Sequence, residues 1–375
     1  MTSLIKEIKE KNIASIFSSA FSELDYSPQG TVFIKPNLCA REITRKSENT
    51  DPLFLRRLCE YLVSLKCYVY VGHRSNMRTK DIEFSFEYTA KISGLNELSN
   101  IKGITVVDLD KCETIKKTID SIDFEIPKIV LNSDSYINLA KLKTHMQTSV
   151  SLSTKNQIGL LPMRQRLRAH STGLDRHISY LASTIHPTIN IIEGIYAMEG
   201  NGPHHGKDKK VNLALFGDNM VELDSLACYV MDIDFKSVEH LRIAKELGVG
   251  DFISYETANN FKRFQKPFIK PSPYEKKGIC LYVYPSDACP GCLKALEEAG
   301  KKLKNKIVFK FLLRSFIFPT EIFAGHCKEM KKFKSAKSLG IGNCSKSFCS
   351  KNDIIHLAGC PMSSSEIASF LERNL

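Results

Sequence analysis

At 375 residues, with 43% hydrophobic and 25% charged residues, the chain can bury a large core, and we expect two domains. Of the net charge of +12, two thirds lies from Tyr274 onward, where 17 Lys or Arg face 9 Asp or Glu. The start, MTSLIKEIKEKN, lacks the apolar core of a signal peptide, no apolar run is long enough to span a membrane, and basic runs carry no regularly spaced aromatics. We therefore expect a cytoplasmic protein without a membrane span and without a nucleic-acid partner.

The first part of the chain has the pattern of an α/β fold. Residues 2–24 predict an amphipathic helix, and residues 31–35 predict a buried strand that stops at Pro36, which cannot continue a central ladder. Lys35 and Asn37 then lie at the carboxyl end of this strand, where open α/β sheets bind ligands, although an ordinary turn explains Lys-Pro-Asn equally well. A helix capped at Thr50 and further strands at 67–71, 104–108, 128–131 and 136–139 predict a mostly parallel sheet flanked by helices.

The stretch 136–162 gathers polar residues after a short apolar strand. Lys141, Lys143 and His145 stand at alternating positions, so they lie on one side if the strand continues. Lys155 and Asn156 follow within the same stretch. Apolar residues among these lysines favour a site for a negatively charged or carbonyl-bearing ligand. A buried strand whose lysines extend to the surface is the alternative.

Three further segments are candidates for the same site. Residues 163–177 hold Arg164, Arg166, Arg168, His170 and His177, which can line an anion site or form an exposed helix face. A strand at 188–193 leads into a predicted glycine-rich loop, 194–206, whose amides can approach a ligand. Asp218 and Asp224 follow a strand at 211–216 and can act in acid–base chemistry or bind a cation, but helix capping explains Asp218 as well.

Residues 259–277, rich in proline and lysine, are the predicted linker.

Several motifs resemble, in order, the family catalogued as domain of unknown function 362. They are VFIKPN (32–37), TDP (50–52), INLAKLKTH (137–145), STKNQIGLLP (153–162), His170, EGNGP (199–203) and GDNMVELDSLA (217–227). The resemblance covers about residues 31–248. It implies a bacterial or archaeal protein, often fused to iron–sulfur modules, with no general reaction assigned. The shared polar positions that it implies as ligand-site candidates are Lys35, Asn37, Lys143, His145, Lys155, Asn156, His170, Glu199, Asn201, Asp218 and Asp224.

A second domain begins near Gly278 and carries clustered cysteines. The expected order is a strand at 279–284, the CPGC loop with Cys289 and Cys292, a helix at 293–303, a strand at 307–313, the loops of Cys344 and Cys360, and a helix at 364–372. In a cytosolic protein, such clusters indicate metal or redox chemistry rather than disulfides. Four cysteines in three loops provide the thiolates that a 4Fe–4S cluster or a zinc ion needs.

The pattern CxxC, GxC and HxxGCP resembles the proximal-cluster domain of the nickel–iron hydrogenase small subunit and its complex I counterpart. The resemblance implies a flavodoxin-like domain with one 4Fe–4S cluster on Cys289, Cys292, Cys344 and Cys360. Met362 stands where a second proline is usual, and Cys327 and Cys349 are reserve ligands. Two alternatives remain: a zinc site that uses Cys349, and a thioredoxin-like dithiol facing the segment Phe318-Pro319-Thr320.

These patterns combine into one hypothesis: residues 1–258 bind a small anionic substrate, and residues 278–375 hold a 4Fe–4S cluster. We expect an oxidoreductase that takes electrons from a ferredoxin- or flavodoxin-like donor. The catalytic candidates are His145, Lys143, Lys155, His170, Asp218 and Asp224, and the substrate-binding candidates are Lys35, Asn37, Lys141, Asn156, Glu199, Asn201 and Gly202. A lyase or isomerase, and an electron carrier or redox sensor, are the competing interpretations. A flavin and a divalent cation at the two aspartates also stay open.

Overall fold

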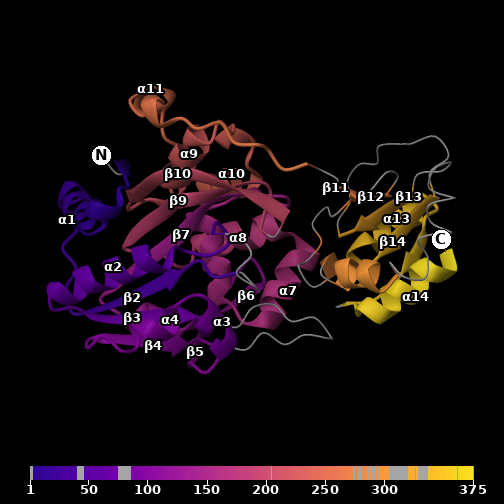
Figure 1. Ribbon diagram of the computed structural model, residues 1–375, viewed down its shortest axis with the longest axis horizontal. Helices are drawn as coiled ribbons and strands as arrows, with labels where there is room; N and C mark the ends of the chain where they lie inside the picture. Colours follow the sequence, from indigo (N-terminus) through magenta and orange to yellow (C-terminus); the bar gives the residue numbers. More distant parts are fainter. Residues whose placement is uncertain are drawn as a thin grey trace. The chain divides into compact units, whose positions relative to one another are not determined.

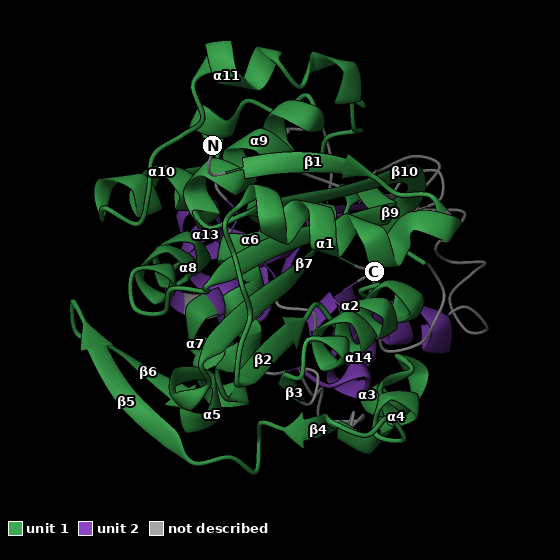
Figure 2. Ribbon diagram, turned by 90° about the vertical axis from the view of Figure 1, so that its left-hand side faces the viewer, with its two compact units in different colours: residues 1–76, 85–169, 173–271 green, residues 77–84, 170–172, 272–375 purple. Residues whose placement is uncertain are grey.

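The structure is a computed structural model that describes residues 3–39, 46–74, 86–203, 205–272, 275–277, 281–284, 288, 292–293, 295–303, 320–325, 327, 337–360 and 362–374. It divides into two compact units, shown in different colours in Figure 2. Unit 1 comprises residues 1–76, 85–169 and 173–271, and unit 2 comprises residues 77–84, 170–172 and 272–375. Each unit has its own sheet, so each is described by itself.

Unit 1 is built on a mixed, mostly parallel sheet (Figure 1). Its strands lie in the order β1 (Ser3–Glu7), β10 (His205–Gly217), β9 (Ile189–Asn201), β7 (Ser135–His145), β2 (Thr31–Pro36), β3 (Tyr68–His73) and β4 (Ile104–Asp108), with β8 (Ser149–Ser151) paired to β7. From β9 to β4 all neighbours are parallel, whereas β10 and β1 add antiparallel pairings. The carboxyl ends of β2, β3 and β7 therefore meet along one edge of the sheet.

Alternating residues of these strands face two separate cores. On one face Val32 and Ile34 pack with α1 (Ile13–Glu23), α2 (Pro52–Ser64) and α4 (Leu95–Leu98). On the other face Phe33 packs with α8 (Leu174–Ala182) and with the hairpin of β5 (Thr114–Ile119) and β6 (Ile122–Pro127). Further along that face, Leu142 packs with α9 (Met220–Val230) and α10 (Glu239–Glu246). A sheet covered on both faces explains why its central strands β2 and β7 are buried along almost their whole length.

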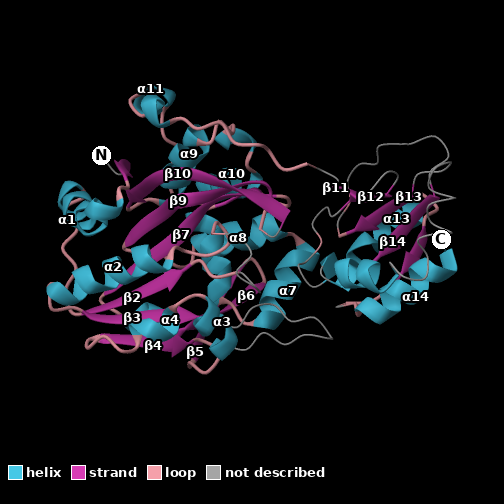
Figure 3. Ribbon diagram, viewed as in Figure 1, coloured by secondary structure: helices cyan, strands magenta, loops and turns pink. Residues whose placement is uncertain are grey.

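The remaining elements of unit 1 are short or lie in the connections. They are η1 (Glu10–Asn12), α3 (Phe86–Ile92), α5 (Lys128–Asn132), α6 (Ser153–Asn156), η2 (Gln157–Leu160), α7 (Met163–Thr172), η3 (Phe235–Ser237), α11 (Tyr255–Asn259) and η4 (Lys262–Phe264). Figure 3 separates these helices from the strands by colour. Among the helices of the described residues, none is long and apolar enough to cross a membrane.

Three expectations about local structure are wrong. Residues 2–24 are not one helix, because β1 pairs with β10, with Leu4 opposite Phe216, before α1 begins. Residues 128–131 are helical in α5, and the strand of that region is β6, which ends just before them. The predicted glycine-rich loop is mostly a continuation of β9, which runs to Asn201 and returns as β10. In each case pairing or packing with a distant segment overrides the local pattern.

Unit 2 contains a smaller sheet. Four strands are parallel in the order β12 (Leu281–Tyr284), β13 (Thr320–Ala324), β14 (Lys337–Ile341) and β15 (Ile355–Leu357), and β11 (Glu275–Lys277) is antiparallel to β12. Helical residues 295–303, η5 (Asn343–Ser345), α13 (Lys346–Lys351) and α14 (Ser364–Asn374) accompany it. The α/β class is thus confirmed, with a mostly parallel main sheet and a small parallel C-terminal sheet. The strand expected at 307–313 lies outside the described residues, and a flavodoxin-like strand order stays a prediction.

The predicted linker, 259–277, begins inside unit 1. Phe261, Phe264 and Phe268 are buried in the core that contains α9 and α10. The division between the units falls after Pro271. The bounds of the linker stay a prediction, but its first ten residues pack as part of unit 1.

Candidate functional site

Three lysines lie in the region where β2 and β7 end. Lys35 is 2% exposed at the end of β2, and its Nζ donates to Pro36 O over 2.6 Å. Lys143, near the end of β7, donates to Glu48 O at 2.8 Å and lies 3.2 Å from Cys39 Sγ. Lys155 is half-buried in α6. We call Lys35, Lys143 and Lys155 the lysine cluster; within the described part of the chain none of them hydrogen-bonds to a carboxylate.

Burial and mutual repulsion make this cluster electrostatically unfavourable. Burial first, and then the charges of Arg166 and Lys143, lower the pKa of Lys35 to about 7, while Cys39 opposes them. Burial likewise lowers the pKa of Lys155 to about 8, with repulsion from Lys143 as the next cause. Both ammonium groups therefore change charge close to neutral pH. An anion placed among them would favour their charged forms and remove this penalty.

A second group of basic side chains follows β3, which lies beside β2. His73 is 3% exposed, and burial, then Lys35 and Arg166, hold its pKa well below its ordinary value. Neither ring nitrogen has a hydrogen-bond partner among the residues described. Arg74 is 3% exposed; its Nε donates to Leu160 O at 2.6 Å and its Nη1 to Asp110 at 2.8 Å. We call His73 and Arg74 the β3 corner.

The lysine cluster and the β3 corner meet at η2. A Cβ added at Gly159 would lie 2.9 Å from Lys35 Nζ, and the next residue, Leu160, accepts the hydrogen bond from Arg74. Two cationic side chains from neighbouring strands thus approach consecutive residues of one 3-10 turn. Glycine at 159 leaves the space that the ammonium group of Lys35 occupies.

Sequence reasoning missed the β3 corner. His73 and Arg74 follow a buried strand that pairs in parallel with β2, which is the same position that singled out Lys35. That position is the signal that could have found them. Arg166, which the sequence offered as one of five alternatives, is 8% exposed and acts electrostatically on both Lys35 and His73.

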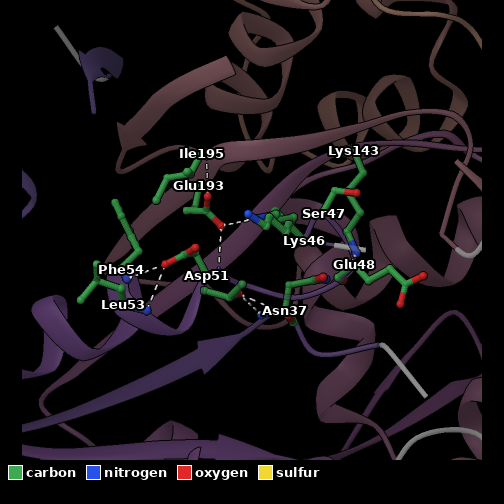
Figure 4. Close-up of polar contacts among 12 residues, drawn as sticks. Asn37, Lys46, Ser47, Glu48, Asp51, Leu53, Phe54, Lys143, Glu193 and Ile195 are labelled. Carbon is green, nitrogen blue, oxygen red and sulfur yellow. Dashed lines mark hydrogen bonds and ion pairs between the residues drawn. The ribbon is translucent and has the colours of Figure 1, made fainter. Parts of the chain in front are cut away.

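Lys141, in contrast, has its charge neutralised inside the fold. Its Nζ lies 2.6 Å from Glu193 Oε2, and both side chains are fully buried. Glu193 also accepts from the backbone N of Asp51 at 3.1 Å and of Ile195 at 2.6 Å (Figure 4). Asp51, rather than Thr50, is the N-cap of α2. This arrangement joins β7, β9 and α2, and it has the contacts of a structural ion pair.

The candidate asparagines hold the site together. Asn156 Nδ2 donates to Lys35 O at 3.1 Å and to Asn138 Oδ1 at 2.8 Å, and its Oδ1 accepts from Asn37 Nδ2 at 3.1 Å. These bonds tie α6 to the ends of β2 and β7. The Oδ1 atom of Asn37 is buried without a partner among the described groups. Asn156 therefore positions the lysine-bearing segments, and Asn37 retains an acceptor for a ligand.

The two candidate aspartates have different surroundings. Asp224 is fully buried, and its carboxylate accepts from the backbone and hydroxyl groups of Ser153 and Thr154, at 2.8 and 2.9 Å for the two backbone N atoms. It therefore caps α6. Asp218 is exposed, and the cap of α9 is Asn219, not Asp218. Among the described residues, neither aspartate hydrogen-bonds to a lysine of the cluster.

The remaining candidates are dispersed. His145 is 4% exposed, and its Nδ1 accepts from the backbone N of Gln147 at 3.2 Å. Glu199 pairs with Lys209 at 2.9 Å and accepts from Ile269 N at 3.1 Å. A side chain at Gly202 would collide with Thr144 O, so this glycine serves packing against β7. Asn201 closes the end of β9, and His170, which is buried, is grouped with unit 2.

Comparison with known proteins assigns this unit. The family described as "Domain of unknown function (DUF362)" matches residues 32–229, which is more than half of the chain. The chain belongs to this family. The DUF362 match contains the lysine cluster, the β3 corner and Gly159, whereas all cysteines of the expected cluster lie outside it.

Two further likenesses are weaker. The thylakoid-associated protein sll1697 of Synechocystis sp. is 29% identical over 130 residues, which cover 33% of this chain and 40% of that protein. The match therefore spans about two fifths of the relative's length. The lactate racemase apoprotein of Thermoanaerobacterium thermosaccharolyticum aligns with a TM-score of 0.41 at 13% identity, over 98% of this chain and 89% of its own. A likeness at this level does not assign an activity to the DUF362 protein.

Outside the DUF362 match, three cysteine-bearing segments of unit 2 converge. Asn343 N donates to Gly359 O at 3.0 Å, and Gly359 N donates back to Asn343 Oδ1 at 2.9 Å. These bonds join the loops of Cys344 and Cys360. A Cβ added at Gly342 would lie 3.5 Å from Cys292 Sγ, which brings the third segment to the same place. Cys289 lies outside the described residues, and those described include no group of three or more potential metal ligands.

The two reserve cysteines are core residues. Cys349 is fully buried, its Sγ packs against Gly340 of β14, and burial raises its pKa. Cys327 is 8% exposed and packs with Tyr284 and Phe323. Of the cysteines that the structure describes, Cys292, Cys344 and Cys360 are therefore the better placed for a shared ligand.

Proposed function

We propose that this DUF362 protein is an iron–sulfur-dependent oxidoreductase that reduces a small anionic substrate bound at the lysine cluster. The observation that carries the proposal is the gathering of three buried or half-buried ammonium groups, none of which hydrogen-bonds to a carboxylate in the described part of the chain. Buried charges are normally paired, so an anion is the expected complement. When a substrate gains electrons, the same ammonium groups would stabilise its added negative charge.

Unit 1 contains side chains that can supply the protons needed for a reduction. Lys35 Nζ, with a pKa of about 7, is present in both charge states near neutral pH, so it can hold or release a proton there. The Nδ1 atom of His145 accepts hydrogen bonds from Gln147 N and Thr148 N, so a neutral ring carries its proton on Nε2. Lys35, Lys155 and His145 are therefore the proton-carrying groups that we assign.

The described cysteine-bearing segments of unit 2 support the proposal of a 4Fe–4S cluster. Cys292, Cys344 and Cys360 stand in three segments held together by the Asn343–Gly359 bonds and the Gly342 contact, and Cys289 would complete the four thiolates. A bound cluster would supply single electrons taken from a ferredoxin- or flavodoxin-like donor. The lysines of this part of the chain would balance the charge of the thiolates.

Two observations disfavour the other interpretations of the cysteines. A zinc site that uses Cys349 would have to extract a thiol packed against Gly340 in the core. A thioredoxin-like arrangement would place Thr320 beside the CPGC loop. Thr320 instead pairs with Leu281 at the amino ends of β13 and β12, whereas the CPGC loop follows the carboxyl end of β12.

Metal analysis after anaerobic purification tests the redox proposal. We expect about four irons per chain and a cluster signal in the electron paramagnetic resonance spectrum of the dithionite-reduced protein. Cys360→Ser should lose this signal, whereas the matched core substitution Cys349→Ser should keep it. Stoichiometric zinc without a signal would contradict the proposal. Turnover that survives in a Cys360→Ser protein without a cluster would also contradict it.

A further inference from the structure

We propose that the β3 corner, together with Lys35, is a phosphate subsite that binds a tetrahedral, doubly charged phosphoryl group of the substrate. The inference rests on the proposed function, because it names the substrate class of the same basic site. Nothing in the DUF362 match or in the sequence motifs assigns His73 or Arg74 a role. Their unused hydrogen-bonding groups, their position at η2 and the local balance of charge support this assignment.

The first observation is a set of buried polar atoms without partners. Arg74 uses Nε for Leu160 O and Nη1 for Asp110, but its Nη2 is buried with no acceptor among the described groups. Both ring nitrogens of His73 are in the same state. A buried donor without an acceptor destabilises the protein, so such atoms are rare unless a ligand or water completes them.

The second observation is convergence. Arg74 Nε and Lys35 Nζ reach consecutive residues of η2, and the charge of Lys35 acts electrostatically on His73. The groups thus come from two neighbouring strands at the edge where parallel sheets bind ligands. A guanidinium with two positions already fixed presents its third nitrogen in a rigid direction. Such a preorganised donor suits the geometry of a phosphate oxygen.

The third observation is the charge balance, which favours a doubly charged group. The lysine cluster contributes three ammonium groups, none bonded to a carboxylate among the described residues, and the only carboxylate bonded to Arg74 there is Asp110. A single carboxylate from a ligand would neutralise one of these charges. A phosphoryl dianion neutralises two and offers oxygens in several directions, which matches donors from β2, β3 and β7.

Binding of a dianion must also change the protonation of Lys35. The charged groups that face it are Arg166 and Lys143, with Cys39 opposing them, and its pKa in the ligand-free protein is about 7. At pH 8 most Lys35 side chains are neutral, and a dianion beside Nζ would favour the ammonium form. At pH 8 Lys35 should therefore take up close to one proton on binding, and Lys155, whose pKa is about 8, can add up to about half a proton; at pH 6 both lysines are already charged and take up almost none.

Titration calorimetry of the full chain with inorganic phosphate and with sulfate tests this inference. Sulfate is a tetrahedral dianion that carries no proton itself, so proton uptake, obtained from the heat in buffers of different ionisation enthalpy, reports on the protein alone. We expect both dianions to bind at pH 8 at least tenfold more tightly than acetate at equal ionic strength. Proton uptake should lie between about one and one and a half per chain with sulfate.

Two variants locate the binding. Arg74→Lys keeps the charge but removes the guanidinium fork, and it should weaken phosphate binding at least tenfold. Arg176→Lys is the matched control, because Arg176 also pairs with an aspartate, Asp120, but is 48% exposed at its side chain; it should change binding less than twofold. Gly159→Ala places a methyl group against the flexible end of Lys35 without changing any charge. It should preserve the fold and weaken binding.

The inference is overturned if acetate competes as well as sulfate, or if Arg74→Lys and Gly159→Ala both bind phosphate like the parent protein. Its failure can be distinguished from failure of the proposed function. A protein with about four irons and a cluster signal, but no dianion binding, would overturn the phosphate subsite alone. A protein that binds phosphate with proton uptake but holds no iron would overturn the redox function and leave the subsite standing.

Discussion

Lys141 and Lys35 lie on neighbouring strands of the same sheet and are both buried, yet their surroundings are opposite. Lys141 is 0% exposed and lies 2.6 Å from the carboxylate of Glu193. Lys35 is 2% exposed, and its 2.6 Å hydrogen bond is to a backbone carbonyl, while the nearby charges of Arg166 and Lys143 repel it. Lys141 thus pairs with a carboxylate within the fold, whereas Lys35 hydrogen-bonds to no carboxylate among the described residues.

This difference separates structural charge from ligand-binding charge. A buried ion pair with further hydrogen bonds, such as Lys141–Glu193, fixes how β7, β9 and α2 fit together, and its removal affects folding. A buried cation without a carboxylate lowers the stability of the ligand-free protein. Because buried charges are normally paired, an anion is the expected partner of such a cation in the functional state.

The largest effect should follow from breaking the complete pair. Lys141→Met leaves the Glu193 carboxylate buried without its cation, so we expect the free energy of unfolding to fall by about 3–5 kcal/mol. Urea denaturation at pH 7 measures this change. The double variant Lys141→Met/Glu193→Gln should recover a large part of the loss, because neither charge is then left alone. A loss below about 1 kcal/mol in the single variant would show that the pair is not structural.

Asp224 is a second charge completed within the fold, and its removal should have the next largest effect. In Asp224→Asn the new NH2 group meets donors on Ser153 and Thr154, so charge-assisted hydrogen bonds are lost and α6 loses its cap. We expect a loss of about 3 kcal/mol of unfolding free energy. Asp218→Asn, at an exposed position on the same connection, is the control and should change it by less than about 0.5 kcal/mol. Equal effects would remove the distinction between the two aspartates.

The sequence could predict much of the framework, because its signals are local. The apolar run 31–36 ended by Pro36, the leucine stripe of α2 and the strand at 68–73 are one β-α-β unit, and periodicity alone predicts it. The position of Lys35 at a strand end follows from the same reading. β1 could not be predicted in this way, because Leu4 is held opposite Phe216 by a pairing that joins residues about two hundred positions apart in the sequence.

The sequence could not tell which polar residues are paired. Strand alternation predicts equivalent positions for Lys141 and Lys143 in β7. The difference arises because β9 pairs with β7 and places the carboxylate of Glu193 beside Lys141. The position of Asp224 after a strand predicts an acid–base candidate. Its capping role could not be predicted locally, because its hydrogen-bond donors, Ser153 and Thr154, lie about seventy residues earlier in the sequence. The β3 corner was missed because a single His-Arg pair has no motif of its own. Its role as a candidate site depends on η2, which begins at residue 157 and lies beside the β3 corner only in the folded chain.

The next effect is a dependence of stability on pH that only the incomplete lysine should show. The pKa of Lys35 is about 7 in the folded chain and 10.5 as its ordinary value, so between these pH values the unfolded state binds one more proton. Stability must then rise with pH in this window, since the penalty of burying the ammonium is complete below pH 7 and fades toward pH 10.5. Relative to Lys35→Met, the wild type should gain about 2 kcal/mol between pH 7 and pH 9 in urea titrations. Parallel pH profiles for the two proteins would contradict it, and saturating sulfate should flatten the difference.

The smallest expected loss of unfolding free energy comes from Lys35→Met. The same lysine-to-methionine change should be the most damaging at Lys141, on the neighbouring strand. Lys35→Met removes a buried cation and one hydrogen bond to Pro36 O, but it leaves no carboxylate alone and it relieves the repulsion from Arg166 and Lys143. At pH 7 its unfolding free energy should lie within about 1 kcal/mol of the wild type, or above it. Lys141→Met serves as the control, since it introduces the same side chain at an equally buried lysine. If both variants lose several kcal/mol of unfolding free energy, Lys35 has a structural partner and the contrast between the two lysines fails. If only Lys141→Met loses stability, the burial of Lys35 is not structural, and this outcome supports an anion as its partner.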